Sequence, residues 1–425
     1  MTIGKIRTYL LDKAARFFFL LSSSPYVLLS KWLYICFRKP FELVTNSYVV
    51  HAVTAEDYIK TYGLERKILV SGRKGYYANV VWADINNEQE LIETDIPDIG
   101  LYKFRDVIVH RGSDLIINLK ERMAINDYCA TVGDDKNKVY DDSITKAFAG
   151  NILIVRLSNK KLDTDSAISL NGKYSFNYYH AIYETLIKLV VIAEHVDKFP
   201  ESIPFLIDED TEIIPSLKRI FEILSEGLKH NVLSIPKGYS YLVKDLYWVS
   251  SVNFLTPNHK DYLLAKDSEY VFDRENTLKL KEKLLVYKSE QVFPKRIFVS
   301  RRGTNHRRFN EDEVFEILER RGFKKVYPQE LTIEEQVSLF NGAEWIIGGS
   351  GAALTNLLFC SSFCKVVCLS RYTKIMAPVF IPPVCFNQAS IVYYRSSKGS
   401  SVPIVHSDFS IDINQFKDFA ESYIK

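Results

Sequence analysis

The sequence lacks the patterns that mark several common classes of protein. Its six cysteines form no CxxC pair and none adjoins a histidine, so we expect buried, reduced thiols and no metal site. No GxGxxG or GxxxxGK[ST] motif occurs, which disfavours a dinucleotide-binding dehydrogenase and a P-loop enzyme. The net charge of +3 gives no field that would attract nucleic acid, so we predict no nucleic-acid partner.

A long apolar run is missing as well. Residues 1–37 combine cationic residues with two apolar stretches, but three serines, Pro25 and Lys31 interrupt them. No segment therefore reaches the ~20 apolar residues that span a bilayer. We expect two short helices, which either lie in a membrane interface or pack on the protein's own core. The chain is predicted to be cytoplasmic, and peripheral on the inner face of the membrane if residues 1–37 make the first of these contacts.

The length and the order of the apolar segments predict two α/β domains. A chain of 425 residues exceeds the roughly 250–300 residues at which a single core usually stops growing. We expect a helical, amphipathic segment over residues 1–45 and an acceptor-side α/β domain over 46–290. A nucleotide-sugar-binding domain follows over 291–400. Residues 401–425 are expected to form a tail and a helix that is free to pack back on the N-terminal domain.

The block after Pro294 has the most regular pattern. Apolar strands are expected at residues 296–300, 325–327, 345–347 and 365–369, with helices between them. This alternation predicts a parallel, doubly wound sheet. A GGSG turn at residues 348–351 follows the third strand, where glycines admit a ligand closely, Ser350 caps the next helix and free N–H groups favour an anion. The alternative is a tight turn without a ligand.

A basic cluster follows the first strand of this block. Residues 300–308 read SRRGTNHRR and are expected at the same edge of the sheet as the glycine turn. Guanidinium groups bind phosphate oxygens in pairs, so the four arginines are able to converge on one diphosphate without a metal ion. The alternative is a solvated basic loop.

The N-terminal half contains one compact group of reactive side chains, NYYHAIYE at residues 177–184. His180 and Glu184 are four residues apart, so a helix places them on one face, where either is able to act as a general base. The alternative is a structural hydrogen bond. The acidic stretch at residues 208–210 is the nearest match to a DxD metal motif, and we interpret it as a solvated loop.

Residues 295–370 resemble the C-terminal domain of glycosyltransferase family 61, through RIFVSRRGTNHRRFNEDEV and GAEWIIGGSGAALTNLLF, and NYYHAIYETL resembles a further motif of that family. The resemblance implies a GT-B fold, in which two Rossmann-like domains face each other across a cleft. It also implies an inverting transfer that needs neither a metal nor another cofactor. The donor-binding residues implied by the resemblance are Arg301, Arg302, His306, Arg307, Glu330, Gly349, Ser350, Gly351, Ala352, Thr355 and Asn356.

His180 and Glu184, which lie in the motif NYYHAIYETL, are the predicted catalytic residues, and Asn177 and Tyr179 in the same motif are predicted on the acceptor side. Two positions depart from the family pattern: serine replaces the usual histidine at residue 350, and alanine replaces the frequent tryptophan at residue 181. We therefore expect a donor pocket and an acceptor side that differ from the usual geometry of the family.

These patterns together predict a glycosyltransferase that moves a hexose or pentose from a nucleoside diphosphate donor, most simply UDP-linked, to a glycan or lipid-linked acceptor. Its expected role is the synthesis of a surface polysaccharide such as a capsule. Two alternatives stay open. The first is a non-catalytic protein of the same fold that binds a nucleotide sugar or a partner, because Ser350 replaces the histidine. The second is a methyltransferase or dehydrogenase of the Rossmann type.

Overall fold

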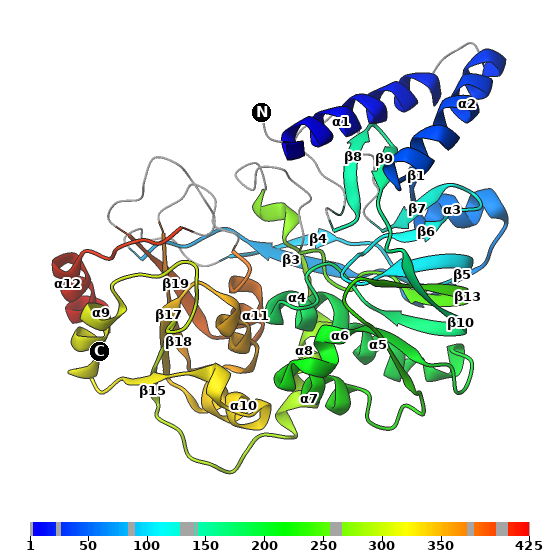
Figure 1. Ribbon diagram of the computed structural model, residues 1–425. Helices are drawn as coiled ribbons and strands as arrows, with labels where there is room; N and C mark the ends of the chain where they lie inside the picture. Colours follow the sequence, from blue (N-terminus) through cyan, green and yellow to red (C-terminus); the bar gives the residue numbers. More distant parts are fainter. Residues whose placement is uncertain are drawn as a thin grey trace.

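The computed structural model describes residues 3–22, 27–83, 90–127, 141, 143–255, 266–371, 378–396 and 407–424; within the first two helices it describes the side chains of residues 10–21, 33 and 36–45. Cys129 and the predicted boundary at residue 400 lie outside the described residues. Figure 1 shows a helical hairpin above a large mixed sheet, with a smaller parallel sheet beside it. The predicted α/β class is confirmed.

The hairpin consists of α1 (Ile3–Ser22) and α2 (Val27–Thr45). The inner face of α1 buries Leu11, Ala15 and Phe18 against β8 (Thr145–Ala149) and β9 (Ile152–Val155). The inner face of α1 therefore packs on the protein's own core, which is one of the two outcomes expected from the sequence. None of the described helices is both long enough and apolar enough to span a bilayer.

The large sheet contains a Rossmann-like unit. Its strands run in the order β12-β11-β10-β13-β5-β6-β7-β1-β9-β8, with β2 paired to β5. Strands β10 to β13 are mutually parallel and have the 3-2-1-4 order of a nucleotide-binding half-fold. The parallel strands are β10 (Lys160–Leu170), β11 (Phe205–Asp208), β12 (Val232–Ile235) and β13 (Tyr239–Val249). The remaining strands are mostly antiparallel; besides β8 and β9 they are β1 (Tyr48–Thr54), β2 (Arg66–Val70), β5 (Ile99–His110), β6 (Ile116–Asn118) and β7 (Met123–Asn126).

Helices connect the parallel strands of this unit. The segment from β10 to β11 holds α4 (Tyr178–His180), a π-helix η1 (Ala181–Leu186) and α5 (Lys188–Glu194), as the helical pattern beyond residue 177 predicts. The other elements of the N-terminal half are α3 (Ala55–Tyr62), η2 (Val196–Lys198), α6 (Glu209–Ile213), α7 (Pro215–Leu224), η4 (Asp267–Glu269), α8 (Arg274–Leu285) and a small sheet of β14 (Phe272–Asp273), β3 (Lys74–Ala78) and β4 (Leu91–Asp95).

The smaller sheet has five parallel strands, as expected for a doubly wound domain. Their order is β16-β15-β17-β18-β19, so the winding direction reverses between β15 and β17. The bounds are β15 (Arg296–Val299), α9 (Glu311–Glu319), β16 (Lys324–Val326), η5 (Pro328–Glu330), α10 (Ile333–Gly342), β17 (Trp345–Gly349), η6 (Ala352–Phe359), β18 (Lys365–Ser370), α11 (Ile381–Phe386), β19 (Ser390–Arg395) and α12 (Ile413–Tyr423).

The C-terminal helix corrects one expectation. Residues 401–425 were expected to be free to pack back on the N-terminal domain, but α12 packs against α9 and the C-terminal sheet (Figure 1). Phe416 and Ala420 are fully buried in the cluster that also holds Phe298 and Val314. The reason is the apolar face of α12, which covers the side of the sheet that α9 leaves open.

The two halves share one apolar core. A single cluster of buried side chains runs from η1 and α5 through α8 to α10, η6 and α11. Consequently α4, which follows β10, packs against η6, which follows β17. The carboxyl ends of the parallel strands of both halves therefore lie close to the same contact, which is the arrangement that a site between two Rossmann-like units requires.

The buried ion pair between Arg73 and Asp273 generates a stability prediction. The Arg73 guanidinium lies 2.6 Å from Asp273 Oδ2 and also donates to the carbonyls of Pro97 and Val252. Changing Arg73 to Met leaves a buried carboxylate without its cation, so we expect the free energy of unfolding to fall by roughly 3–5 kcal/mol. Urea unfolding measures this. Adding Asp273→Asn should recover part of the loss, and a purely additive double variant would contradict the account.

Candidate functional site

Two guanidinium groups lie side by side at the carboxyl edge of the C-terminal sheet. Arg301 follows β15, and its Nη1 and Nη2 donate to the carbonyls of Ser350 (2.9 Å) and His306 (2.8 Å). Arg307 Nη1 donates to the same Ser350 carbonyl at 3.3 Å. Because the winding of the sheet reverses between β15 and β17, this position is the crevice where ligands bind in open α/β sheets.

These two cations have no directly paired carboxylate in the described part of the chain. None of its carboxylates forms an ion pair with either guanidinium, and each Nε is buried without a hydrogen-bond partner. Burial together with the neighbouring Arg307 lowers the pKa of Arg301 to about 10. Burial also raises the pKa of the adjacent Cys368 thiol to about 12, so this thiol is neutral. An anion bound here would relieve both the desolvation and the repulsion of the guanidinium groups.

The glycine turn touches the arginine pair directly. A Cβ on Gly351 would overlap the Arg301 guanidinium, and a Cβ on Gly349 would lie 2.9 Å from the Phe309 ring. A side chain at residue 351 would therefore displace the Arg301 guanidinium from this position, whereas the backbone angle does not require glycine, since its φ of 173° is extended. The predicted convergence of Arg301 with the glycine turn is observed.

The local backbone of the turn differs from the prediction. The segment after residue 351 is the 3₁₀-helix η6, and the Ser350 side chain does not cap it. The Ser350 N–H is also not free, because it donates to the carbonyl of Leu369 at 2.9 Å. The amides at the start of η6, those of Gly351, Ala352 and Ala353, precede its first hydrogen bond, from Leu354 N–H to the Gly351 carbonyl, and so lack an intrahelical acceptor. Guanidinium groups thus contribute more to this site than amides do.

Only two of the four predicted arginines converge. Arg308 forms an ion pair with Asp408 at 2.7 Å, and Arg302 is exposed. Of the predicted donor-binding residues His306 and Arg307, only Arg307 directs its side chain at the turn, whereas the His306 side chain is exposed and its carbonyl accepts from Arg301. Arg307 has a left-handed φ of 56°, a conformation that costs about 1 kcal/mol or more and is typical of binding sites.

Glu311 supports this loop, a function that the sequence reasoning missed. Its carboxylate accepts hydrogen bonds from the Ser300 hydroxyl (2.6 Å) and the Arg301 N–H (2.7 Å). Glu330 is exposed on η5 beyond β16, and the capping box of α10 consists of Thr332 and Glu335, not of Glu330. Its contact with a ribose stays a prediction.

Two predicted donor-binding residues instead connect the halves of the protein, so their assignment was wrong. Thr355 and Asn356 are 1% and 0% exposed. Asn356 Oδ1 accepts from the Tyr178 hydroxyl at 2.8 Å, and its Nδ2 donates to Gln336 Oε1 at 2.8 Å. The Thr355 carbonyl accepts from the Tyr183 hydroxyl at 3.3 Å. Because the whole Asn356 amide is engaged, it links the turn that carries Ser350 to the helix that carries His180.

His180 and Glu184 form the predicted pair. The distance between His180 Nδ1 and Glu184 Oε2 is 2.5 Å, and both side chains are partly exposed. With the carboxylate ionised, Nδ1 carries the proton and Nε2 is left as an acceptor, which is the tautomer of a general base. Glu184 lies on the π-helix η1, and π-helical turns are frequent at functional sites.

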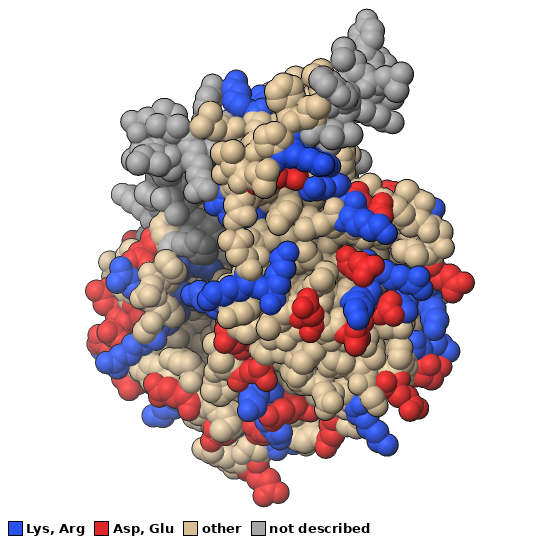
Figure 2. Space-filling model, turned by 45° about the vertical axis from the view of Figure 1, so that its right-hand side comes forward, with Lys and Arg blue, Asp and Glu red and all other residues tan. Residues whose placement is uncertain are grey.

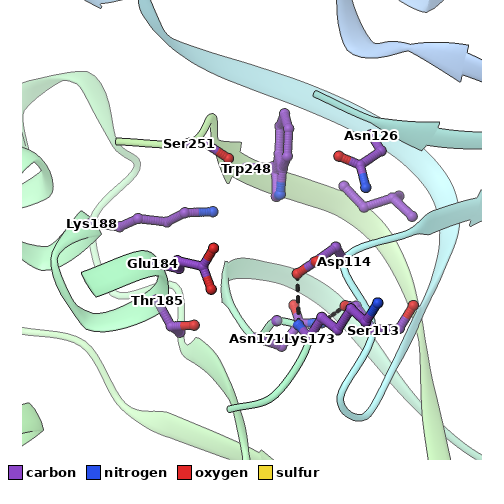
Figure 3. Close-up of a pocket in the computed structure, with 12 residues that line it drawn as sticks. Ser113, Asp114, Asn126, Asn171, Lys173, Glu184, Thr185, Lys188, Trp248 and Ser251 are labelled. Carbon is purple, nitrogen blue, oxygen red and sulfur yellow. Dashed lines mark hydrogen bonds between the residues drawn. The ribbon is translucent and has the colours of Figure 1, made fainter. Parts of the chain in front are cut away.

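Behind Glu184 is a small polar cavity at the N-terminal switch point. It lies beyond the carboxyl ends of β10 and β13, and its volume of about 30 Å³ has room for one or two water molecules. Figure 3 shows that Glu184, Lys188 and Asp114 point into it beside Trp248. Burial, followed by the charge of Asp141, raises the pKa of Asp114 to about 7. Burial lowers the pKa of Lys188.

Two further predictions in this half need correction, and a third stays a prediction. Asn177 caps α4 by accepting from the Tyr179 N–H at 3.0 Å and is partly exposed, so its contact with an acceptor stays a prediction. Tyr179 is 7% exposed and its ring packs against Tyr183 and Phe380, so the predicted contact with an acceptor was wrong. The stretch at residues 208–210 is not a solvated loop: Asp208 is fully buried and accepts from the Gly112 and Gly172 N–H groups.

The link through Asn356 gives a testable prediction. Asn356→Leu removes the partners of the Gln336 side-chain oxygen Oε1 and of the Tyr178 hydroxyl, so we expect the free energy of unfolding to fall by about 2–4 kcal/mol. Tyr178→Phe should cost less, because it removes one partner only. Chemical denaturation of both variants and of their combination forms a double-mutant cycle. A coupling below about 0.5 kcal/mol would contradict the hydrogen bond that joins the two halves.

The raised pKa of Asp114 predicts a pH dependence of stability. Its folded pKa of about 7 lies above the unfolded value of 3.8, so the unfolded state releases the proton first as the pH rises. Stability is therefore lost between about pH 4 and pH 7 and stays lower above this window. Asp114→Asn removes this loss, and we expect a gain on the order of 2 kcal/mol at pH 8 but little change at pH 4. Thermal unfolding at both pH values measures it, and an equal effect at both would contradict the assignment.

The comparisons with known proteins agree with this geometry. The family model described as Glycosyltransferase 61 matches residues 178–367, somewhat less than half of the chain. No curated protein matches the chain. The matched range begins at the Tyr178 that contacts Asn356 and includes the pair of His180 and Glu184, the two arginines and the glycine turn. Through this segment the chain is similar to glycosyltransferase family 61, and the match supports a glycosyltransferase function in general.

Proposed function

We propose that the protein transfers a sugar from a nucleoside diphosphate donor, most simply a UDP-sugar, to an acceptor hydroxyl with inversion and without a metal ion. The observation that carries this proposal is the partly buried pair of Arg301 and Arg307, which forms no ion pair with a carboxylate of the described chain and lies at the switch point of a parallel sheet. A diphosphate supplies the missing negative charge. As the leaving group departs, its charge increases, and the guanidinium groups stabilise it where other enzymes use Mg²⁺.

His180 is the proposed base and Glu184 the residue that orients it. The acceptor oxygen attacks the anomeric carbon from the face opposite the diphosphate, and the bond from that carbon to the phosphate oxygen breaks. The acceptor proton moves to His180 Nε2, while the hydrogen bond to Glu184 holds Nδ1 protonated and stabilises the imidazolium. The contact of α4 with η6 supports this division, because it brings the base close to the segment that begins at the donor turn.

The finer parts of the proposal concern the substrates and the location. The transferred sugar is a hexose or a pentose, and the acceptor is a glycan or a lipid-linked sugar of a surface polysaccharide. The small cavity beside Glu184, about 30 Å³ in volume, is too small for a sugar, so the acceptor would bind outside it, on the His180 side. A cytoplasmic location, where nucleotide sugars and reduced thiols are both available, fits the buried Cys360, Cys364 and Cys368.

A donor panel tests the proposal. We expect the wild-type chain to release UDP from at least one UDP-sugar in the presence of a chelator, and to bind UDP in calorimetry. Arg301→Met and Arg307→Met should each weaken UDP binding about 10–100-fold, the value of a charge-assisted hydrogen bond. Arg308→Met is the matched control, because it lies in the same loop but pairs with Asp408 at the surface. It should bind UDP as the wild type does.

The catalytic pair has its own outcome in the same assay. His180→Ala and Glu184→Gln should keep UDP binding but reduce turnover by about 10²–10⁴-fold. UDP binding by the wild type without any turnover would support the non-catalytic alternative. A thermal shift with S-adenosylmethionine or NAD, and none with UDP, would support the other Rossmann-type enzymes and refute the proposal.

A further inference from the structure

The N-terminal hairpin has an apolar surface that the fold does not use. The inner stripe of α1, formed by Leu11, Ala15 and Phe18, is buried on β8 and β9. A second stripe on α1 stays exposed, with Leu10 at 60% and Leu20 at 67%. A helix on the surface of a globular protein normally needs only one apolar stripe, so the second one indicates a partner.

The second helix extends this surface. Phe37 is 53% exposed and contacts Phe17 of α1 edge to face, with ring centroids 5.5 Å apart. Further along α2, Leu43 and Val44 are more than four-fifths exposed. Figure 1 shows that the hairpin projects from the body of the molecule, away from the C-terminal sheet. The exposed surface is therefore accessible to a large, flat partner.

The charge of the hairpin is opposite to that of the remaining chain. Residues 1–45 contain seven Lys or Arg against Asp12 and Glu42, a net charge of +5, whereas the whole chain has +3, so the other 380 residues have −2. Glu42 also faces inward, where it accepts from the Val49 N–H and pairs with Arg122. In Figure 2 the upper part of the visible face shows blue and tan with little red, whereas the lower part mixes red and blue.

We propose that this hairpin docks on an anionic lipid surface, with Leu10, Phe17, Leu20 and Phe37 in the interface and Lys13, Arg16 and Lys39 near the headgroups. Exposed apolar and aromatic side chains flanked by cations are the features of interfacial helices. A second copy of the chain is a poorer occupant, because two hairpins of charge +5 repel each other. The packing of α1 on β8 and β9 then fixes the orientation of the N-terminal sheet at the membrane.

Sedimentation of the full-length chain with vesicles tests this docking surface. We expect binding to vesicles of phosphatidylglycerol and phosphatidylcholine in equal parts at low salt, and weak binding to pure phosphatidylcholine. The triple variant Lys13→Glu, Arg16→Glu, Lys39→Glu should reduce binding to anionic vesicles at least about tenfold. The triple variant Leu10→Ser, Phe17→Ser, Leu20→Ser should also reduce vesicle binding. At high salt this variant should still bind the vesicles less than the wild type does.

The matched control reverses three exposed lysines on the body of the protein, Lys60→Glu, Lys161→Glu and Lys229→Glu. It should bind as the wild type does, and an unchanged unfolding midpoint shows that each variant is folded. The proposal is overturned if the wild type does not sediment with anionic vesicles, or if the control loses binding equally. It is also overturned if light scattering shows hairpin-dependent self-association without vesicle binding. UDP binding and turnover are read separately, so these outcomes are independent of the proposed transferase reaction.

Discussion

Two guanidinium cations that are held together without an anion are the constraint on which the site depends. Like charges in a partly buried position are costly, and the protein keeps Arg301 and Arg307 in place through carbonyl oxygens and the carboxylate of Glu311 on the loop backbone. This cost is tolerated where a ligand of opposite charge completes the site. The close approach of Gly351 to Arg301 shows that the turn and the arginine form one unit.

The rest of the architecture brings a second unit to this one. Each half contributes a parallel sheet, and the switch points of both sheets lie near the contact between α4 and η6. Asn356 fixes that contact, because its amide is bonded to Tyr178 on one side and Gln336 on the other. The base candidate His180 is two residues from Tyr178. A shift of the donor turn would therefore be transmitted to the base through one short chain of buried hydrogen bonds.

Sequence reasoning predicted most of this framework where local patterns are sufficient. The strands and helices after Pro294 and the pair of His180 and Glu184 follow from periodicity and spacing. It failed where long-range contacts decide. Burial of Asn356, the pairing of Arg308 with Asp408 and the burial of Asp208 depend on partners distant in the chain. The 3₁₀ geometry of η6 and the packing of α12 on α9 have the same origin, because tertiary contacts override local preference.

A crystal structure of the chain with UDP, grown with a chelator, tests the central claim most directly. The account predicts that the diphosphate lies beyond the ends of β15 and β17, with its oxygens about 3 Å from the guanidinium groups of Arg301 and Arg307. Both side chains would then turn from the Ser350 carbonyl to the phosphates. UDP bound elsewhere, or a diphosphate held by a metal ion while both arginines keep their contacts with Ser350, would contradict it.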